Sequence, residues 1–404
     1  MDKKSVMGCV ILLCLSILTT GCWDRREIDE RNFVLAIGID MADAGLKSGI
    51  KPEQAREVRR IETFSQPHGS KRYRLSLQIL NMSPGSGEQE KSKAYVISNT
   101  GESFFEMIRD MLGQSSKALW FEHLQVIIIS EAVLKQAGLG EILDFFKRDS
   151  EMGSRIKIYV TSGEARSLLE YIPPSKEAGG VYLADIIRNQ SRNSHVAGAK
   201  TDLGYTIEYL DNKANINVPR IELADKVVKL GGAAAFEKDH FIGYVDEYAI
   251  AGWKFIAGTE KSAIITIPCP DHPDHQAVFE LFRHDTRLRP HVDGDAIYYT
   301  LDITMYGSLA ELQGDIKQDN TMDAQYIHKL ENAFADEVKR NVIYAMDISQ
   351  KKLKTDVRNL FAAKLKAHEP DAWEKVKDQW AEIYPDIPLV ISANVFINEI
   401  GIHK

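Results

Sequence analysis

The sequence has 404 residues, enough for two or three domains of ordinary size. Hydrophobic residues make up 44% of the chain and charged residues 27%, a composition that excludes a disordered protein and a polytopic membrane protein. The formal net charge of −8 argues against a protein that coats nucleic acid through its overall charge, so no nucleic-acid partner is expected.

The first 22 residues have the pattern of an export signal. Two lysines precede a mostly apolar run from Val6 to Leu18, and Thr19-Thr20-Gly21 then leads to Cys22. The run is shorter than the roughly 20 residues of a transmembrane helix, so cleavage is expected. We predict a signal peptide over residues 1–21 and a lipidated Cys22, acylated with chains such as palmitate, at the mature N-terminus. The alternative is an ordinary secretory signal followed by a coincidental cysteine.

The region after Cys22 begins with residues typical of a sheet. Phe33 to Asp40 is a nearly continuous apolar run and predicts a strand covered on both faces. Tyr73 to Leu80 alternates between apolar and polar residues and predicts a neighbouring strand, and Tyr95 to Ser98 predicts a further short strand.

A helix is expected after Ser103, which can cap it, with an apolar stripe that includes Phe104, Phe105, Ile108, Met111 and Leu112. Residues 124–129 predict a central strand, and helices over 139–148 and 164–171 bracket an alternating strand at 156–160. Pro173-Pro174 ends this mixed α/β region, because tandem prolines continue neither a helix nor a central strand.

The rest of the chain predicts two further regions of strands and helices. The middle region has a helix at 181–189, strands at 229–236 and 240–245, and a helix at 247–256. The last region has strands at 277–282 and 297–306, helices at 322–344 and 373–383, and a final strand at 389–400. We expect an α+β protein of three domains, each a mixed or antiparallel sheet with flanking helices, over residues 22–175, 176–265 and 266–404.

The sequence holds no Walker A motif, dinucleotide-binding glycine pattern, nucleophile elbow or H-E-x-x-H zinc motif, which disfavours an enzyme of a common class. One cluster, Asp271-His272-Pro273-Asp274-His275 with His284, Asp285 and His291, has side chains that suit zinc or copper. Its spacing matches no ligand rule, and a polar turn between two domains explains the same residues.

Two single residues, Cys269 and His123, are further candidates for a site. Cys269 is expected to be a buried or half-buried structural thiol, because no base or positive field that would activate it can be identified. His123 precedes a core strand and is expected to be structural rather than part of a site.

Basic residues concentrate between Lys47 and Arg74, a segment that contains eight basic and three acidic residues. We hypothesise that this segment contacts anionic lipid headgroups, and a solvated loop is the alternative.

Several stretches in order along the chain resemble the Ger(x)C family of spore germination lipoproteins, the C subunits of GerA-type germinant receptors. They are Cys22-Trp23-Asp24-Arg25-Arg26-Glu27-Ile28, Ala36 to Asp40, Thr100 to Ser103, Phe121 to Val126, Leu143 to Asp149, Gly231 to Phe236, Trp373, and Trp380 to Pro385. The resemblance spans nearly the whole mature chain.

The resemblance implies a non-enzymatic subunit without cofactor or metal, anchored through Cys22 on the outer face of the spore inner membrane. Its implied partners are the multi-span A and B subunits of a nutrient germinant receptor. Two other classes remain open: an extracytoplasmic solute-binding lipoprotein, and a secreted metal-dependent hydrolase that would use the cluster from Asp271 to His291.

Overall fold

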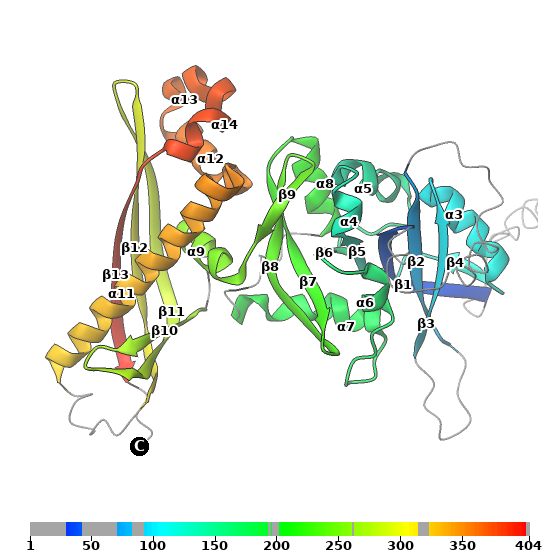
Figure 1. The fold of residues 1–404 in the computed structure, drawn as a ribbon, viewed down its shortest axis with the longest axis horizontal. Coiled ribbons are helices and arrows are strands. Elements are labelled where there is room, and N and C mark those ends of the chain that lie inside the picture. Colours follow the sequence, from blue (N-terminus) through cyan, green and yellow to red (C-terminus); the bar gives the residue numbers. More distant parts are fainter. Residues whose placement is uncertain are drawn as a thin grey trace, which may run out of the picture.

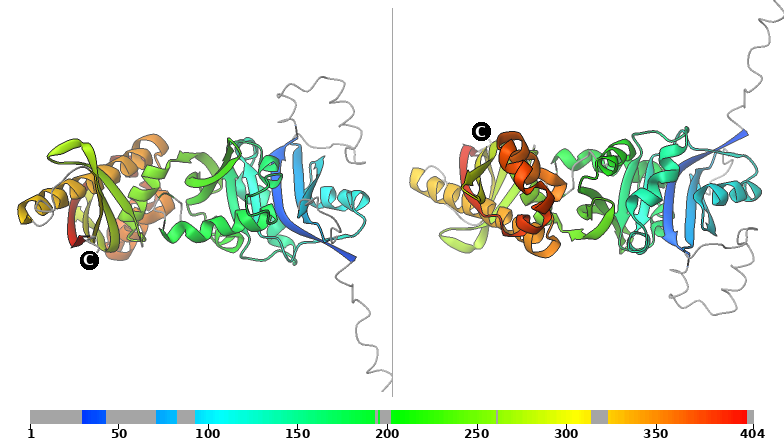
Figure 2. Two further views of the ribbon diagram at one scale, coloured as in Figure 1. Left: turned by 90° about the horizontal axis from the view of Figure 1, so that it is seen from below. Right: turned by 90° about the horizontal axis from the view of Figure 1, so that it is seen from above.

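The computed structural model of the protein describes residues 30–42, 71–82, 93–192, 195, 202–260, 262–313 and 323–400. They form an elongated molecule with a large mixed sheet at one end and a smaller sheet, crossed by a long helix, at the other (Figures 1 and 2). The predicted α+β class, with mixed sheets and flanking helices, is confirmed. The predicted signal peptide and Cys22 lie outside the described residues.

Within the described residues, nine strands form the large sheet in the order β3-β2-β1-β5-β6-β7-β8-β9, with β4 paired to β1. The strands are β1 (Arg31–Met41), β2 (Tyr73–Leu80), β3 (Ala94–Gly101), β4 (Ala118–Trp120), β5 (Val126–Ser130), β6 (Lys157–Thr161), β7 (Ile216–Ala224), β8 (Val227–Glu237) and β9 (His240–Val245). β1 is antiparallel to β2 and parallel to β5. The predicted pairing of the first two strands and the central place of β5 are confirmed.

Helices cover both faces of the first part of this sheet, which explains why β1 is apolar from Phe33 to Ile39. One face packs against α3 (Phe104–Met111), α4 (Glu131–Leu134), α5 (Leu139–Arg148) and α8 (Leu203–Asp211). The opposite face packs against α6 (Ala165–Leu169) and α7 (Gly179–Asp185). The prediction that β1 is buried on both faces is confirmed.

The polar face of β2 is also buried, because α6 and α7 cover it. Gln78 satisfies its amide there: its Nε2 donates to the Leu169 carbonyl at 2.5 Å, and its Oε1 accepts from the Gly180 N–H at 2.6 Å. The apolar and polar alternation of β2 therefore separates two buried layers rather than a core from solvent.

Asp40, at the end of β1, fixes the position of α6. Its carboxylate is fully buried and accepts hydrogen bonds from the backbone N–H groups of Ala165 at 2.8 Å and Arg166 at 3.0 Å. These are N–H groups that the first turn of a helix cannot pair internally. Burial nevertheless raises the pKa of the Asp40 carboxyl.

The strand β8 separates two hydrophobic cores. A single bridge between Val160 and Arg220 joins β6 to β7, and β7, β8 and β9 then pair antiparallel. Along β8, Ala234 and Phe236 pack into the core of the large sheet, whereas Ala233 and Ala235 pack into the core at the other end of the molecule. The sequence patterns did not predict β7 and α8.

Within the described residues, four strands form the second sheet in the order β10-β11-β12-β13. They are β10 (Ile264–Cys269), β11 (His272–Asp293), β12 (Ala296–Leu312) and β13 (Leu389–Ile400). Antiparallel pairing joins the first three, and β13 is parallel to β12. The predicted final strand is confirmed, whereas β11 and β12 extend well beyond the predicted 277–282 and 297–306.

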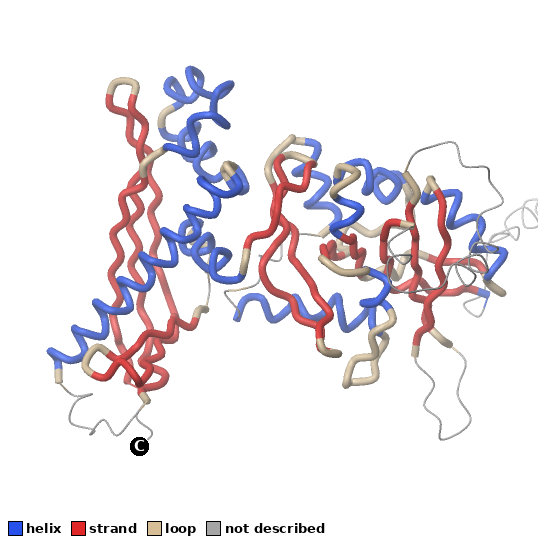
Figure 3. The backbone as a smooth tube through the Cα atoms, viewed as in Figure 1, coloured by secondary structure: helices blue, strands red, loops and turns tan. Residues whose placement is uncertain are grey.

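The long helix α11 (Ala324–Asp347) crosses one face of this sheet and packs against α9 (Glu247–Ala257), as Figures 1 and 3 show. Three shorter helices follow: α12 (Leu360–His368), α13 (Pro370–Val376) and α14 (Trp380–Ile383). The predicted single helix over 373–383 is wrong, because a 3₁₀ turn at Lys377–Gln379 separates α13 from α14.

Candidate functional site

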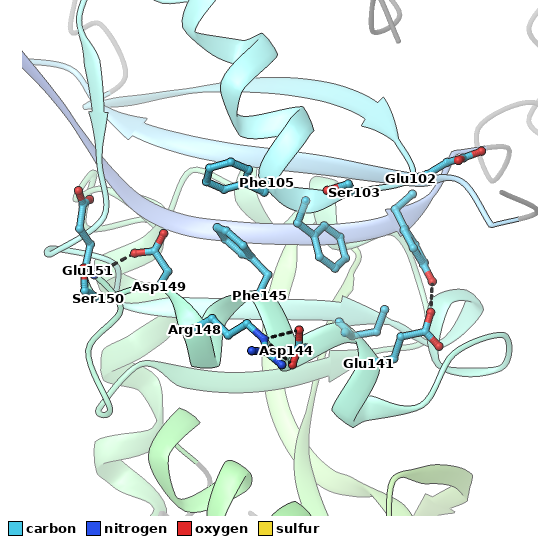
Figure 4. A pocket seen from close by; sticks show the side chains of 13 residues that line it. Glu102, Ser103, Phe105, Glu141, Asp144, Phe145, Arg148, Asp149, Ser150 and Glu151 are labelled. Carbon is cyan, nitrogen blue, oxygen red and sulfur yellow. Dashed lines mark hydrogen bonds and ion pairs between the residues drawn. The ribbon is translucent and has the colours of Figure 1, made fainter. Parts of the chain in front are cut away.

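A groove of about 710 Å³ opens between the start of α3 and the exposed side of α5 (Figure 4). It is lined by the first residue of β2, residues 102–105, one side of α5 and the loop at 149–151. Phe105 from α3 and Phe145 from α5 face each other with ring centroids 6.2 Å apart. The groove therefore offers aromatic surface between polar edges.

The local sequence explains why Phe105 is available in this groove. Ser103 caps α3 as predicted, since its Oγ accepts from the Glu106 N–H at 3.4 Å. The buried stripe of α3 is Phe104, Met107, Ile108 and Met111. Phe105, assigned to the apolar stripe by the sequence, instead projects outward and is 52% exposed. One step along a helix turns a side chain by about 100°, which places Phe105 off the buried stripe.

One end of the groove holds a carboxylate with two defined partners. Glu141 accepts from the Lys71 ammonium at 2.7 and 3.0 Å and from the Tyr73 hydroxyl at 3.2 Å. Burial, followed by the charge of Glu141, raises the pKa of Tyr73 to about 12. Tyr73 is therefore a neutral hydrogen-bond donor at physiological pH.

The exposed side of α5 contributes a charge pair to the groove. The Arg148 Nε lies 3.0 and 2.9 Å from the two carboxylate oxygens of Asp144, one helical turn earlier. This hydrogen-bonded guanidinium holds the pKa of Asp144 below its usual value. The pair stays ionised on both sides near neutral pH.

The candidate metal ligands between Asp271 and His291 do not converge. Asp271 lies in the turn between β10 and β11 and pairs with Lys329 at 3.0 Å. Along β11, His284 Nε2 contacts the Glu260 carbonyl at 2.6 Å, and His291 Nε2 contacts the Thr300 hydroxyl at 2.8 Å. Across the described part of the chain, no three His, Cys, Asp or Glu side chains lie close enough to hold a metal ion.

Cys269 and His123 both make packing contacts that give each a structural role. Cys269 is buried beside Tyr326, and burial raises the pKa of its thiol, as expected for an unreactive cysteine. His123 is exposed, and its ring packs edge to face on Phe33 at 5.0 Å between centroids. Of the basic segment, only Lys71, Arg72 and Arg74 lie among the described residues.

A buried carboxylate that the sequence analysis did not identify organises the helices after α11. Asp356 is 3% exposed and accepts from the N–H groups of Phe361 at 3.1 Å and Ala362 at 2.7 Å, and from Trp380 Nε1 at 3.1 Å. The Tyr299 hydroxyl donates to the Phe361 carbonyl at 2.7 Å. Asp356 thus connects the start of α12 to α14.

No helix in the described ranges combines the length and apolar character needed to cross a lipid bilayer.

The chain matches known proteins along nearly its full length. Residues 24–223 match the family model "Spore germination protein N-terminal domain", and residues 231–401 match "Spore germination B3/ GerAC like, C-terminal". Spore germination protein YndF of Bacillus subtilis (strain 168) is 28% identical over 414 residues, which cover 100% of this chain and 98% of the relative. Spore germination protein B3 of the same organism is 23% identical, with 95% and 94% covered.

A solved structure, described as the crystal structure of the GerBC protein, has the same fold. The superposition gives a TM-score of 0.58 at 19% sequence identity and covers 83% of this chain and 98% of that one. The two proteins therefore share a fold, and at 19% identity the superposition shows nothing beyond the fold.

Proposed function

The chain belongs to the Ger(x)C family of spore germination proteins, and from this membership we propose that it is the lipid-anchored C subunit of a nutrient germinant receptor. The subunit acts without catalysis, on the outer face of the spore inner membrane, beside the integral-membrane A and B subunits. The full-length match to spore germination proteins is the observation that carries this proposal. We also propose that its domains divide at residues 22–175, 176–265 and 266–404.

Acylation of Cys22 supplies the membrane attachment. Two or three acyl chains hold a protein stably on a bilayer, whereas a single chain does not. Seven residues lie between Cys22 and Glu30, where the described structure begins, and these eight steps along a fully extended chain span at most about 30 Å. Confinement near the bilayer raises the effective concentration of the subunit for its partners, so modest interfaces suffice for assembly.

Cys22→Ala tests the anchor. The variant is expected to leave the membrane fraction of spores and to lower nutrient-triggered germination, because it removes the acyl attachment without touching the folded body. Cys14→Ala is the matched control, since residue 14 lies in the predicted signal peptide and its loss should change neither readout. Normal membrane retention and germination in the Cys22→Ala strain would refute the anchor.

Detergent co-purification from spore membranes tests the partners. A tagged chain is expected to recover one or two multi-span membrane proteins, identified by mass spectrometry. Recovery of the lipoprotein alone, under conditions in which known receptor complexes survive, would refute the receptor assignment and favour the solute-binding alternative.

A further inference from the structure

We propose that the groove between α3 and α5 is the docking site for a segment rich in Lys and Arg that a membrane-embedded partner presents outside the bilayer. The inference deepens the proposed function and rests on it. Three features of the groove carry it: its charge, the exposed ring of Phe105 and its position in the molecule.

The lining of the groove is strongly acidic. Five carboxylates and one guanidinium line it, a formal net charge of −4. Two of these carboxylates, Asp149 and Glu151, pair with no basic side chain in the described structure, although each accepts a backbone N–H, from Glu151 at 2.9 Å and from Phe121 at 3.1 Å. A backbone N–H satisfies hydrogen bonding but leaves the negative charge, so the groove favours a cationic occupant.

Two basic side chains of the protein itself lie at the edges of the groove and show which cationic groups its side chains can bind. The Lys71 ammonium lies against Glu141 at 2.7 Å. The Arg109 guanidinium lies 5.0 Å from the centroid of the Phe105 ring, a cation–π contact. Glu141 thus takes an ammonium group and Phe105 takes a guanidinium group, and a peptide bearing Lys and Arg offers both.

The position of the groove brings it near the proposed anchor. Glu151 at one end of the groove holds the N–H of Phe121, the residue that follows β4, and β4 pairs with the first residues of β1. The start of β1 is the part of the described structure nearest Cys22 in the chain. A partner whose extracytoplasmic segment rises a short way from the bilayer therefore meets this end of the molecule first.

Photo-crosslinking in spores tests the site with the full-length, acylated chain. The crosslinker p-benzoyl-phenylalanine replaces Phe105 in one strain and Phe282 in a control strain. The two side chains are 52% and 51% exposed, but Phe282 lies on β11 in the other sheet. We expect position 105 to form an adduct with a Lys- and Arg-rich segment of a multi-span protein, and position 282 to form none with that segment.

A charge exchange tests the electrostatic part of the argument. Asp144→Arg makes the lining less negative and should lower the yield of the adduct at position 105 by about fivefold or more. The double variant Asp144→Arg with Arg148→Asp restores both the charge of the lining and the ion pair of α5, and should restore the yield. A double variant that stays as low as the single variant would refute the charge argument.

Other outcomes at position 105 overturn the proposal. An adduct with residues 47–70 of the same chain would make its own basic segment the occupant, and an adduct with lipid or with an acidic segment would contradict the charge argument. If multi-span proteins co-purify with the control strain but position 105 yields no adduct, the groove proposal fails alone. If no membrane protein co-purifies with either strain, the proposed function fails with it.

Discussion

Asp356→Asn is expected to remove a pH dependence from the free energy of unfolding. Burial raises the pKa of the Asp356 carboxyl from 3.8 to about 6, although the hydrogen bonds it accepts act in the opposite direction. The folded chain therefore binds this proton more tightly than the unfolded chain. The stabilisation is complete below the unfolded pKa, near 4, and is lost as the pH rises through about 6.

The size of the effect follows from the two pKa values. One pKa unit corresponds to about 1.4 kcal/mol, and linkage over this interval gives a loss of about 2 kcal/mol between pH 4 and pH 7.5. The nearest phenols, Tyr299 and Tyr384, remain neutral throughout because burial raises their pKa values. Asn does not titrate, and it offers one acceptor oxygen in place of two. The variant should therefore lose about 1–3 kcal/mol at pH 4 through the missing acceptor.

Urea unfolding of the unacylated chain at pH 4, 5, 6 and 7.5 measures both quantities. The wild type is expected to be more stable than Asp356→Asn at pH 4, by a margin that shrinks by about 2 kcal/mol at pH 7.5. Asp302→Asn is the matched control for the chemical change itself, because that carboxylate is 51% exposed on β12. A margin that is constant with pH, or that grows as pH rises, would show that the carboxyl does not titrate as described.

Three further substitutions test packing and buried charge by urea unfolding. Asp40→Ala removes the acceptor for two N–H groups of α6 and should lower the free energy of unfolding by about 1–3 kcal/mol; an unchanged midpoint would contradict this. Gly307→Ala places a Cβ 2.0 Å from a backbone oxygen of β11 and should cost about 2–3 kcal/mol or prevent folding, whereas Gly113→Ala, with open space around it, should be nearly neutral; equal effects would contradict the packing. Lys254→Met deprives buried Glu260 of an ammonium 3.1 Å away and should cost about 3–5 kcal/mol, and a loss below about 1 kcal/mol would show that the ion pair is not needed.

Sequence patterns predicted the elements whose signal is local. The strand at 389–400 matches β13 because every second residue from Leu389 to Ile397 is apolar. β7 was missed because Pro219 interrupts its pattern, and proline normally excludes a strand from the interior of a sheet. In the structure, a register shift between Pro219 and Ile221 accommodates it. A bulge of this kind leaves no clear trace in the sequence.

The groove could not be predicted, because it depends on how α3 and α5 meet. Phe105 and Glu141 lie far apart in the sequence, and each belongs to a helix whose amphipathic pattern shows only which side is buried. Ser103 as a helix cap was within reach of the sequence, and the structure confirms it. Asp356 was out of reach, since a single aspartate carries no sign of the three donors that the fold brings to it.

The hairpin formed by β7 and β8 bears on how this protein can be divided. Similarity to the first family model ends at residue 223 and similarity to the second begins at residue 231, so the gap between the two matched regions falls inside the hairpin. A cut there would leave β7 without its antiparallel neighbour. It would also separate Ala234 and Phe236 of β8 from the hydrophobic core in which they are buried. The gap between the two family-model matches is therefore not a suitable place to cut the chain. Gene fusions and truncations should keep residues 216–245 together.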